Sequence, residues 1–371
     1  MVDCLIVGGG VIGLSLAYEL AQHDLQVQVI DRGKMGREAS WAGAGILPPA
    51  NLQTAIHPFE KLRAMSHRLH RQWAERLREE TAVDTGYRCC GGIYLARSAG
   101  EAASLLGLCD LYQEQQIEIE PLSPADLCRL EPALSPLAES GEVKAAFHLP
   151  GEAQLRNPDY LRALEIACRR RGVDIRENVE AQRFEIKGGR LKSVIAKNAT
   201  FSADRYCITS GAWSQKLLSL LGIDNGIMPI RGQMILFACE KQLFSHILNE
   251  GPRYMVPRDD GHILVGSTEE EVGFDKNTTD EAISELTQLA CSLVPALADA
   301  KQERCWAGLR PGTYDGFPYM GAVPGLENTF VAAGHFRSGL HMSPATAIVM
   351  SQLIRGQQPI IDLSPFRVGR G

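Results

Sequence analysis

The sequence lacks a long apolar run, an excess of positive charge and any internal repeat. No segment offers the ~20 uninterrupted apolar residues that span a bilayer. The apolar start is broken by Gly8, Gly9, Gly10 and Gly13 and follows no basic segment. We therefore expect neither a signal peptide nor obligate membrane insertion, while attachment through an amphipathic face stays open. The net charge of -6 provides no basic stripe for nucleic acid.

The ten cysteines include no Cys-x-x-Cys pair, so neither a zinc site nor a thioredoxin-type redox centre is predicted. Cys4, Cys168 and Cys207 lie in apolar runs, where a thiol packs as a small hydrophobe. Reduced, structural cysteines are typical of the cytoplasm. We therefore predict a cytoplasmic protein without a bound metal, and assign no role to the adjacent Cys89 and Cys90.

The chain of 371 residues exceeds the ~250–300 residues that a single hydrophobic core usually serves, so two domains are expected. Residues 3–7 and 26–31 are short apolar runs on either side of a helical pattern at 11–22. This strand–helix–strand spacing is typical of the first unit of a doubly wound sheet. No low-complexity linker separates the domains, which suggests that the chain crosses between them several times.

Further along, the hydrophobic pattern predicts a series of helices and short strands. The helices are expected at 55–80, 101–137 (punctuated by prolines), 157–171, 280–294 and 344–355. The strands are expected at 91–96, 173–176, 181–187, 191–196, 199–202, 204–209, 232–238, 262–267 and 329–333. Asn157 is predicted to cap one helix, and Ser343 is the predicted N-cap of the last helix with Pro344 at its first position.

The strongest local motif is Gly8-x-Gly10-x-x-Gly13, between the first strand and the first helix. The first glycine permits a tight turn, the second a close approach to a pyrophosphate, and the third close packing of helix on strand. The helix that opens with Val11 and Ile12 supplies N–H donors. Asp31, at the end of the next strand, is at the right spacing to accept a hydrogen bond from a ribose hydroxyl. Dinucleotide binding is predicted; the alternative is a glycine-rich turn without a ligand.

Two further segments favour a flavin. The small residues of 39–47 (ASWAGAGIL), which follow Arg32, let the backbone lie against a flat ring, although a flexible linker has similar composition. The candidate contacts in this run are Ser40, Ala42, Gly43, Ala44, Gly45 and Ile46. Ser210, Gly211 and Trp213 follow another strand, as a turn or as ligand contacts.

The segment 329–340 (TFVAAGHFRSGL) precedes the last predicted helix. Its candidate cofactor contacts are Gly334, His335, Arg337, Ser338, Gly339 and Leu340. A helix N-terminus stabilises the negative charge that a flavin gains on reduction, and this is the function we expect here. An ordinary capped helix is the alternative.

The stretches VGGGVIG, ASWAGAGIL, CITSGAWS, YMVPRDDGHILVGST, WAGLRPGTYDGFPYMG and FVAAGHFRSGLHMSPATA, spread over residues 6–347, resemble the glycine oxidase branch of the D-amino acid oxidase superfamily. The resemblance implies an α/β fold, with a Rossmann-type FAD-binding domain (1–88, 150–228 and 306–371) and an α+β substrate domain with a mainly antiparallel sheet (89–149 and 229–305). It implies noncovalent FAD, although His335 raises the alternative of covalent attachment. It also implies that the Val179 backbone meets the adenine, unless Val179 is a plain strand residue.

For the substrate, the resemblance implies that Arg310 binds a carboxylate, that Tyr254 lies beside it and that Arg337 lies near the site. A guanidinium pairs with a carboxylate through two parallel hydrogen bonds. The chain departs from the family pattern at Glu269 and Ile46, where methionines are expected, and at Pro252, where a histidine is expected. Glu269 either faces the substrate amine or belongs to a solvated run of three glutamates.

The implied reaction is oxidation of glycine, sarcosine or a D-amino acid to the imine and then the 2-oxo acid, with reduction of O2 to H2O2 and a link to thiamin biosynthesis. The expected partners are a small amine and O2, and a homo-oligomer stays open. One alternative is a dehydrogenase of the same fold that passes electrons to a quinone or carrier. Another is a noncatalytic FAD-binding protein or a tRNA-modifying flavoprotein.

Overall fold

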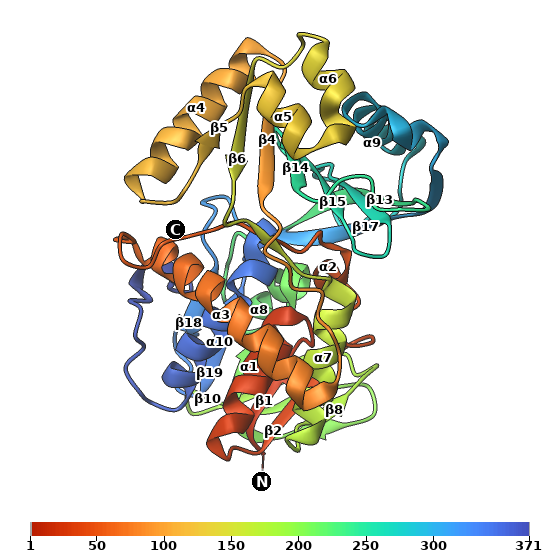
Figure 1. The fold of residues 1–371 in the computed structure, drawn as a ribbon. Coiled ribbons are helices and arrows are strands. Elements are labelled where there is room, and N and C mark those ends of the chain that lie inside the picture. Colours follow the sequence, from red (N-terminus) through yellow and green to blue (C-terminus); the bar gives the residue numbers. More distant parts are fainter. Residues whose placement is uncertain (1, 371) are drawn as a thin grey trace.

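The computed structural model describes residues 2–370, whose strands form one large sheet in the lower and one in the upper half of Figure 1. The lower sheet has six strands in the order β18-β19-β12-β1-β2-β8. They are β1 (Val2–Val7), β2 (Val27–Ile30), β8 (Asp174–Arg176), β12 (Ala203–Ile208), β18 (Tyr319–Ala322) and β19 (Thr329–Ala333). All neighbours are parallel except β18 and β19, which confirms the predicted Rossmann-type sheet.

The upper sheet has eight strands in the order β17-β13-β16-β15-β14-β4-β6-β5. They are β4 (Gly92–Ala96), β5 (Glu120–Pro121), β6 (Ala145–Leu149), β13 (Met228–Ala238), β14 (Ile247–Glu250), β15 (Arg253–Pro257), β16 (His262–Gly266) and β17 (Lys301–Gly312). Only β4 and β14 pair in parallel. The prediction of a mainly antiparallel second sheet is thus confirmed.

The predicted domain boundary at residue 306 falls inside β17. This strand pairs with β13 as far as Gly312, so residues 306–312 belong to the upper sheet rather than to the FAD-binding segment. The rest of the division stays a prediction. Two smaller sheets join β9 (Arg183–Lys187), β10 (Arg190–Ile195) and β11 (Thr200–Phe201), and β3 (Ile46–Leu47) with β7 (Ala153–Gln154).

The helices divide between the two sheets (Figure 1). Beside the lower sheet lie α1 (Val11–Leu20), α3 (Pro58–Thr81), α7 (Asn157–Arg170) and α10 (Gly339–Ile354), with the short α8 (Ser214–Ser219). The short α2 (Ala39–Ala42) lies between the two halves, in contact with α7 and β17. Beside the upper sheet lie α4 (Ala99–Glu114), α5 (Pro124–Leu130), α6 (Ser135–Glu139) and α9 (Asp280–Leu293). Among residues 2–370 no helix combines the length and the apolar character needed to cross a bilayer.

The stretch expected at 101–137, helical and punctuated by prolines, contains three helices, α4, α5 and α6, with the short β5 between the first two. Ser98 and Glu101 form a capping box at the start of α4, and Ser123 and Asp126 form a second one at the start of α5. Each box satisfies N–H groups at a helix start. The second box, followed at once by a proline, therefore begins a new helix inside the expected stretch.

The predicted N-cap roles of Asn157 and Ser343 are both wrong. Helix α7 is preceded by Arg156, and the Asn157 amide Nδ2 donates 117 residues away to the Ser40 carbonyl (2.7 Å). Helix α10 begins at Gly339, so Pro344 lies inside it. A proline inside a helix leaves the carbonyl four residues earlier without its N–H partner. Here the Ser343 Oγ donates to that carbonyl, on Leu340, at 2.9 Å.

Side chains of α3 supply the other hydrogen bonds that α10 loses around the proline. His70 Nε2 donates to the His341 carbonyl (2.8 Å), and the Ala345 N–H donates to Ser66 Oγ (3.0 Å). Burial lowers the pKa of His70 to about 4, which keeps the ring neutral at physiological pH. Helix α10 thus continues through its proline because α3 packs against it.

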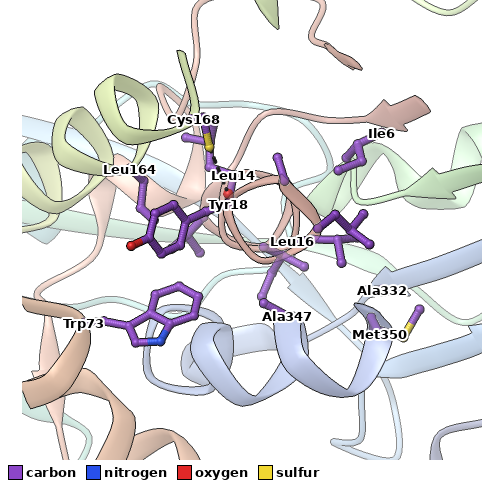
Figure 2. Packing of buried hydrophobic residues seen from close by; sticks show 14 of the residues in the cluster. Ile6, Leu14, Leu16, Tyr18, Trp73, Leu164, Cys168, Ala332, Ala347 and Met350 are labelled. Carbon is purple, nitrogen blue, oxygen red and sulfur yellow. Dashed lines mark hydrogen bonds between the residues drawn. The ribbon is translucent and has the colours of Figure 1, made fainter. Parts of the chain in front are cut away.

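The largest core surrounds α1, which Figure 2 shows nearly end-on. Strand β1 alternates: Cys4 and Ile6 face this core, and Leu5 and Val7 face a second one beside β10. Tyr18 on α1 meets Trp73 on α3 edge to face, with ring centroids 5.3 Å apart. Around them lie Leu164 and Cys168 of α7 and Ala347 and Met350 of α10. Helix α1 is therefore enclosed by the sheet and three helices.

We predict that Trp73→Ala lowers the free energy of unfolding by about 3–5 kcal/mol, because it leaves a cavity in this core. Trp73 is 1% exposed. Urea unfolding followed by far-UV circular dichroism measures the change. Ile56→Ala, at a side chain that is 84% exposed, is the control and should leave the midpoint unchanged. Equal midpoints for both variants would contradict the central place of Trp73.

Candidate active site

A cavity of about 400 Å³ lies between the carboxyl ends of the parallel strands of the lower sheet and one face of the upper sheet. In open α/β sheets, ligands bind outside the carboxyl ends of the strands. Three segments of small residues enter its wall: the turn after β1, the loop before β3 and the loop before α10. The upper sheet contributes Tyr254 and Arg310. One cavity therefore joins the predicted cofactor and substrate residues.

The glycine turn has the geometry that a pyrophosphate site needs. Gly8 has φ +118°, a conformation that disfavours other residues. A Cβ at Gly13 would lie 1.9 Å from the Gly8 carbonyl oxygen, so only glycine lets α1 approach β1 this closely. Gly10 precedes α1 without a side-chain cap. The Val11 N–H donates to Ser40 Oγ (2.9 Å), and the hydroxyl hydrogen of Ser40 stays available for a ligand in the cavity.

Asp31 lies at the end of β2, as the motif predicts. Its Oδ2 accepts from the Gly9 N–H (2.7 Å) and its Oδ1 from the Gly33 N–H (2.8 Å). Burial raises the pKa of the Asp31 carboxyl, and these two hydrogen bonds oppose the rise. The Val179 N–H donates to the Asp31 backbone carbonyl (2.7 Å), which brings Val179 to the same wall. The carboxylate is held in place with acceptor capacity left for a hydroxyl.

Of the residues predicted to contact cofactor or substrate, all but Gly13 and Ala42 line the cavity. Those that line it are Gly8, Gly10, Val11, Ile12, Asp31, Arg32, Ser40, Gly43, Ala44, Gly45, Ile46, Val179, Ser210, Gly211, Trp213, Tyr254, Arg310, Gly334, His335, Arg337, Ser338, Gly339 and Leu340. Gly13 lies behind the turn. The Ala42 methyl packs against Gly308, where a Cβ would come within 2.5 Å, and its carbonyl accepts from Trp306 Nε1 (3.1 Å). Both therefore shape the wall from outside.

His335 is a buried, neutral residue. Its Nε2 lies 3.2 Å from Thr346 Oγ1 on α10, and burial lowers the pKa of the imidazole to about 3. The following residues form a short 3-10 turn, Phe336–Ser338, which leads directly into α10. The N–H groups at the start of α10 thus lie at the cavity wall, five residues earlier than the predicted N-cap.

Arg310 and Tyr254 meet at Ser267, a residue that the sequence did not reveal. Arg310 Nη2 donates to Ser267 Oγ (2.7 Å), Arg310 Nη1 to the Thr268 carbonyl (3.2 Å), and the Tyr254 hydroxyl to Ser267 Oγ (3.1 Å). A Cβ at Gly232 would lie 2.1 Å from Arg310 Nη1, so this glycine makes room for the guanidinium. Burial lowers the pKa of Arg310, a cost that the nearby Tyr254 offsets in part.

Arg337 and Glu269 form an ion pair at the edge of the site. Arg337 Nη1 lies 3.3 Å from Glu269 Oε2, and its Nη2 donates to the Pro252 carbonyl (2.9 Å). The side chains are 36% and 50% exposed. Glu269 is not among the residues of the cavity wall, whereas Arg337 is. The sequence left two interpretations of Glu269, contact with the substrate amine or a place in a solvated run. The structure supports neither of them, because the carboxylate pairs with Arg337.

Tyr94, Glu152 and Asn249 also line the cavity and were missed. Tyr94 OH donates to Glu152 Oε1 (2.8 Å) and Asn249 Nδ2 to Glu152 Oε2 (3.1 Å). Burial raises the pKa of Glu152 to about 7. The three residues come from β4, the loop after β6, and β14, and no local motif connects them. The only signal was Tyr94 within GGIYLA, the strand after two glycines.

A family model described as DAO, FAD dependent oxidoreductase, matches residues 3–353. The chain belongs to this family. The glycine oxidase of Pseudomonas putida is 38% identical to it over 98% of this chain and 97% of that protein. The bifunctional protein ThiO/ThiG of Synechocystis is 33% identical over 98% of this chain and 54% of that protein. The crystal structure of glycine oxidase from Geobacillus kaustophilus has a TM-score of 0.93 and 30% identity, covering 100% of this chain and 98% of that one.

The predicted resemblance and the predicted FAD are thereby confirmed: this DAO-family chain is an FAD-dependent, glycine oxidase-like oxidoreductase. Its own residues fit the cofactor. The glycine turn leaves the space that a pyrophosphate requires, Asp31 retains acceptor capacity for a ribose hydroxyl, and small residues at 43–45 leave the wall open for a flat ring.

We predict that Gly13→Val yields protein without bound FAD, because any Cβ there overlaps the Gly8 carbonyl oxygen. The ratio of flavin to protein absorbance in the purified variant measures the loss. Gly107→Ala is the control, since a Cβ at Gly107 meets nothing within 4 Å. Full FAD occupancy in Gly13→Val would remove the pyrophosphate site from this turn.

Proposed function

We propose that the protein oxidises glycine or another small amino acid at its Cα–N bond, with O2 as the electron acceptor. The imine product then hydrolyses to the 2-oxo acid. The observation that supports this most is the half-buried Arg310 on the cavity wall, which shares the hydroxyl of Ser267 with Tyr254. Within residues 2–370 its guanidinium has no carboxylate partner, and a partly buried cation of this kind is suited to bind a carboxylate from a ligand.

Arg310 and Tyr254 orient the substrate in this proposal. Ser267 Oγ and the Thr268 carbonyl hold one edge of the guanidinium, so its direction is set before the substrate arrives. A carboxylate bound there lies in the same cavity as the loop of Gly43, Ala44 and Gly45. Fixing the substrate in one orientation lowers the entropic part of the barrier.

FAD, when bound, supplies the chemistry of the oxidation itself, because it accepts a hydride from Cα and returns the electrons to O2 as H2O2. The chain contributes the electrostatics around it. The N–H groups at the start of α10 favour negative charge at the cavity wall. His335 beside them is neutral, since burial lowers its pKa to about 3, and adds no competing charge.

A role in thiamin biosynthesis is supported by the likeness to the ThiO/ThiG protein. This chain covers 54% of that protein's length at 33% identity. A dehydrogenase that passes electrons to a quinone or carrier has no supporting observation of its own in residues 2–370.

The experiment that tests the function is anaerobic reduction of the flavin by glycine, sarcosine, D-alanine, D-proline and longer D-amino acids. We expect bleaching of the flavin spectrum by the smallest of these substrates and stoichiometric H2O2 once air is admitted. Reduction without H2O2 would favour the dehydrogenase. No reduction by any of them would contradict an amino acid oxidase.

We predict that Arg310→Ala raises the substrate concentration needed for half-maximal rate by about 30- to 1000-fold, as for truncation of one partner of a buried charge pair. FAD binding should be unchanged, because the glycine turn and Asp31 are untouched. Steady-state kinetics and the flavin absorbance measure the two effects. Arg183→Ala, at an exposed arginine on β9, is the control. An unchanged KM would place the carboxylate site elsewhere, with Arg337 the next candidate.

A further inference from the structure

A row of side chains crosses the upper sheet beneath the cavity. Tyr94 on β4 pairs with Asn249 on β14, and Asn249 pairs in turn with Tyr254 on β15. Side chains at directly opposite positions lie on the same face, with Cβ atoms about 4.5–5.5 Å apart. All three line the cavity. Asn249 is therefore the immediate neighbour of the tyrosine at the proposed carboxylate site.

Next to this row lies the carboxyl group of Glu152, a fully buried residue at the cavity wall. Its Oε1 accepts from Tyr94 OH (2.8 Å) and its Oε2 from Asn249 Nδ2 (3.1 Å). A Cβ at Gly92 would lie 1.8 Å from Oε2, so strand β4 leaves room for this carboxyl only because residue 92 is glycine. A buried carboxyl with two partners and a glycine to accommodate it is a built feature of the sheet.

Glu152 sets the direction of the Asn249 amide. An ionised carboxylate only accepts hydrogen bonds, so the amide nitrogen must face it. The amide oxygen, Oδ1, then points away from Glu152, and within residues 2–370 it accepts no side-chain hydrogen bond. Asn249 is half-buried at the cavity wall. The cavity therefore has a hydrogen-bond acceptor beside Tyr254. The two charged groups at its wall also complement an amino acid zwitterion, Arg310 its carboxylate and Glu152 its ammonium group.

We propose that Asn249 Oδ1 binds the amino group of the substrate, and that Glu152 is the positioning residue that orients this amide. The inference rests on the proposed function, and it narrows the substrate class to primary and secondary amines. A neutral tertiary amine has no N–H to donate to Oδ1. Arg310 and Tyr254 bind the carboxylate on one side, and Asn249 binds the amine on the other.

Protonation of Glu152 removes this constraint, because a protonated carboxyl carries both a donor and an acceptor and no longer requires the amide nitrogen of Asn249 to face it. Burial raises the pKa of Glu152 to about 7. The ionisable groups around it are Tyr94 on β4, Cys90 before β4 and Tyr112 on α4, with Arg63 of α3 beside Tyr112. Preference for an amine is therefore present above about pH 7 and decreases as the pH falls through that value.

The test compares a ligand with an amine and one without it on the FAD-loaded enzyme. Glycine affinity is read from the concentration dependence of anaerobic flavin reduction, and acetate affinity from the shift of the flavin spectrum. The variants are Asn249→Leu, which removes Oδ1, and Glu152→Gln, whose amide offers both a donor and an acceptor and therefore no longer fixes the direction of the Asn249 amide. Asn198→Leu, at an exposed turn, is the control.

We expect Asn249→Leu to weaken glycine binding by about 10-fold or more, the value of one hydrogen bond to a charged group. Glu152→Gln should weaken glycine binding by a smaller factor, and acetate binding should fall by less than about twofold in both variants. N,N,N-trimethylglycine, which has no N–H in any protonation state, should be a poor ligand of the wild type and lose little further in Asn249→Leu. Equal loss of glycine and acetate, or unchanged glycine binding, would overturn the proposal. A wild type that no amine reduces would instead contradict the proposed function, and glycine and acetate binding to the oxidised flavin would still test Asn249.

Discussion

Helix α1 approaches β1 so closely that one added carbon atom on residue 13 would overlap the Gly8 carbonyl oxygen. The cofactor site and the main core both depend on this contact. It brings the first N–H groups of α1 to the carboxyl edge of the sheet, where Val11 already donates to Ser40. It also places α1 within reach of α3, α7 and α10, which surround it. Thr209 Oγ1 donates to the same Gly8 carbonyl (2.7 Å) and ties β12 to the turn.

The upper sheet meets a different constraint, because it accommodates charged groups on a strand surface. Two glycines solve it in the same way: Gly232 leaves space for the Arg310 guanidinium and Gly92 for the Glu152 carboxyl. Burying a charge is costly unless hydrogen bonds compensate it. Arg310 has Ser267 and Thr268 as acceptors, while Glu152 has Tyr94 and Asn249 as donors. Such buried charges serve function rather than stability, since well-packed apolar side chains in the same places would carry a smaller desolvation penalty.

The sequence predicted those parts of the site that are continuous in the chain. The glycine turn, Asp31 and the loop at 43–45 are each local, and their chemistry follows from a few adjacent residues. Ser267, Glu152 and Asn249 were missed because sheet pairing between distant strands brings them together. The wrong N-cap at Ser343 has a similar cause. The α10 helix passes through Pro344 because Ser66 and His70, more than 270 residues away, replace its missing hydrogen bonds.

The departures from the family pattern at Glu269 and Pro252 act on Arg337 rather than on the substrate amine. The positive charge of Arg337 lowers the pKa of Arg310, and the negative charge of Glu269 raises it. Glu269 pairs with Arg337, and the Pro252 carbonyl accepts from the same guanidinium. Within residues 2–370, this arrangement leaves Arg310 without a carboxylate partner at the proposed substrate site.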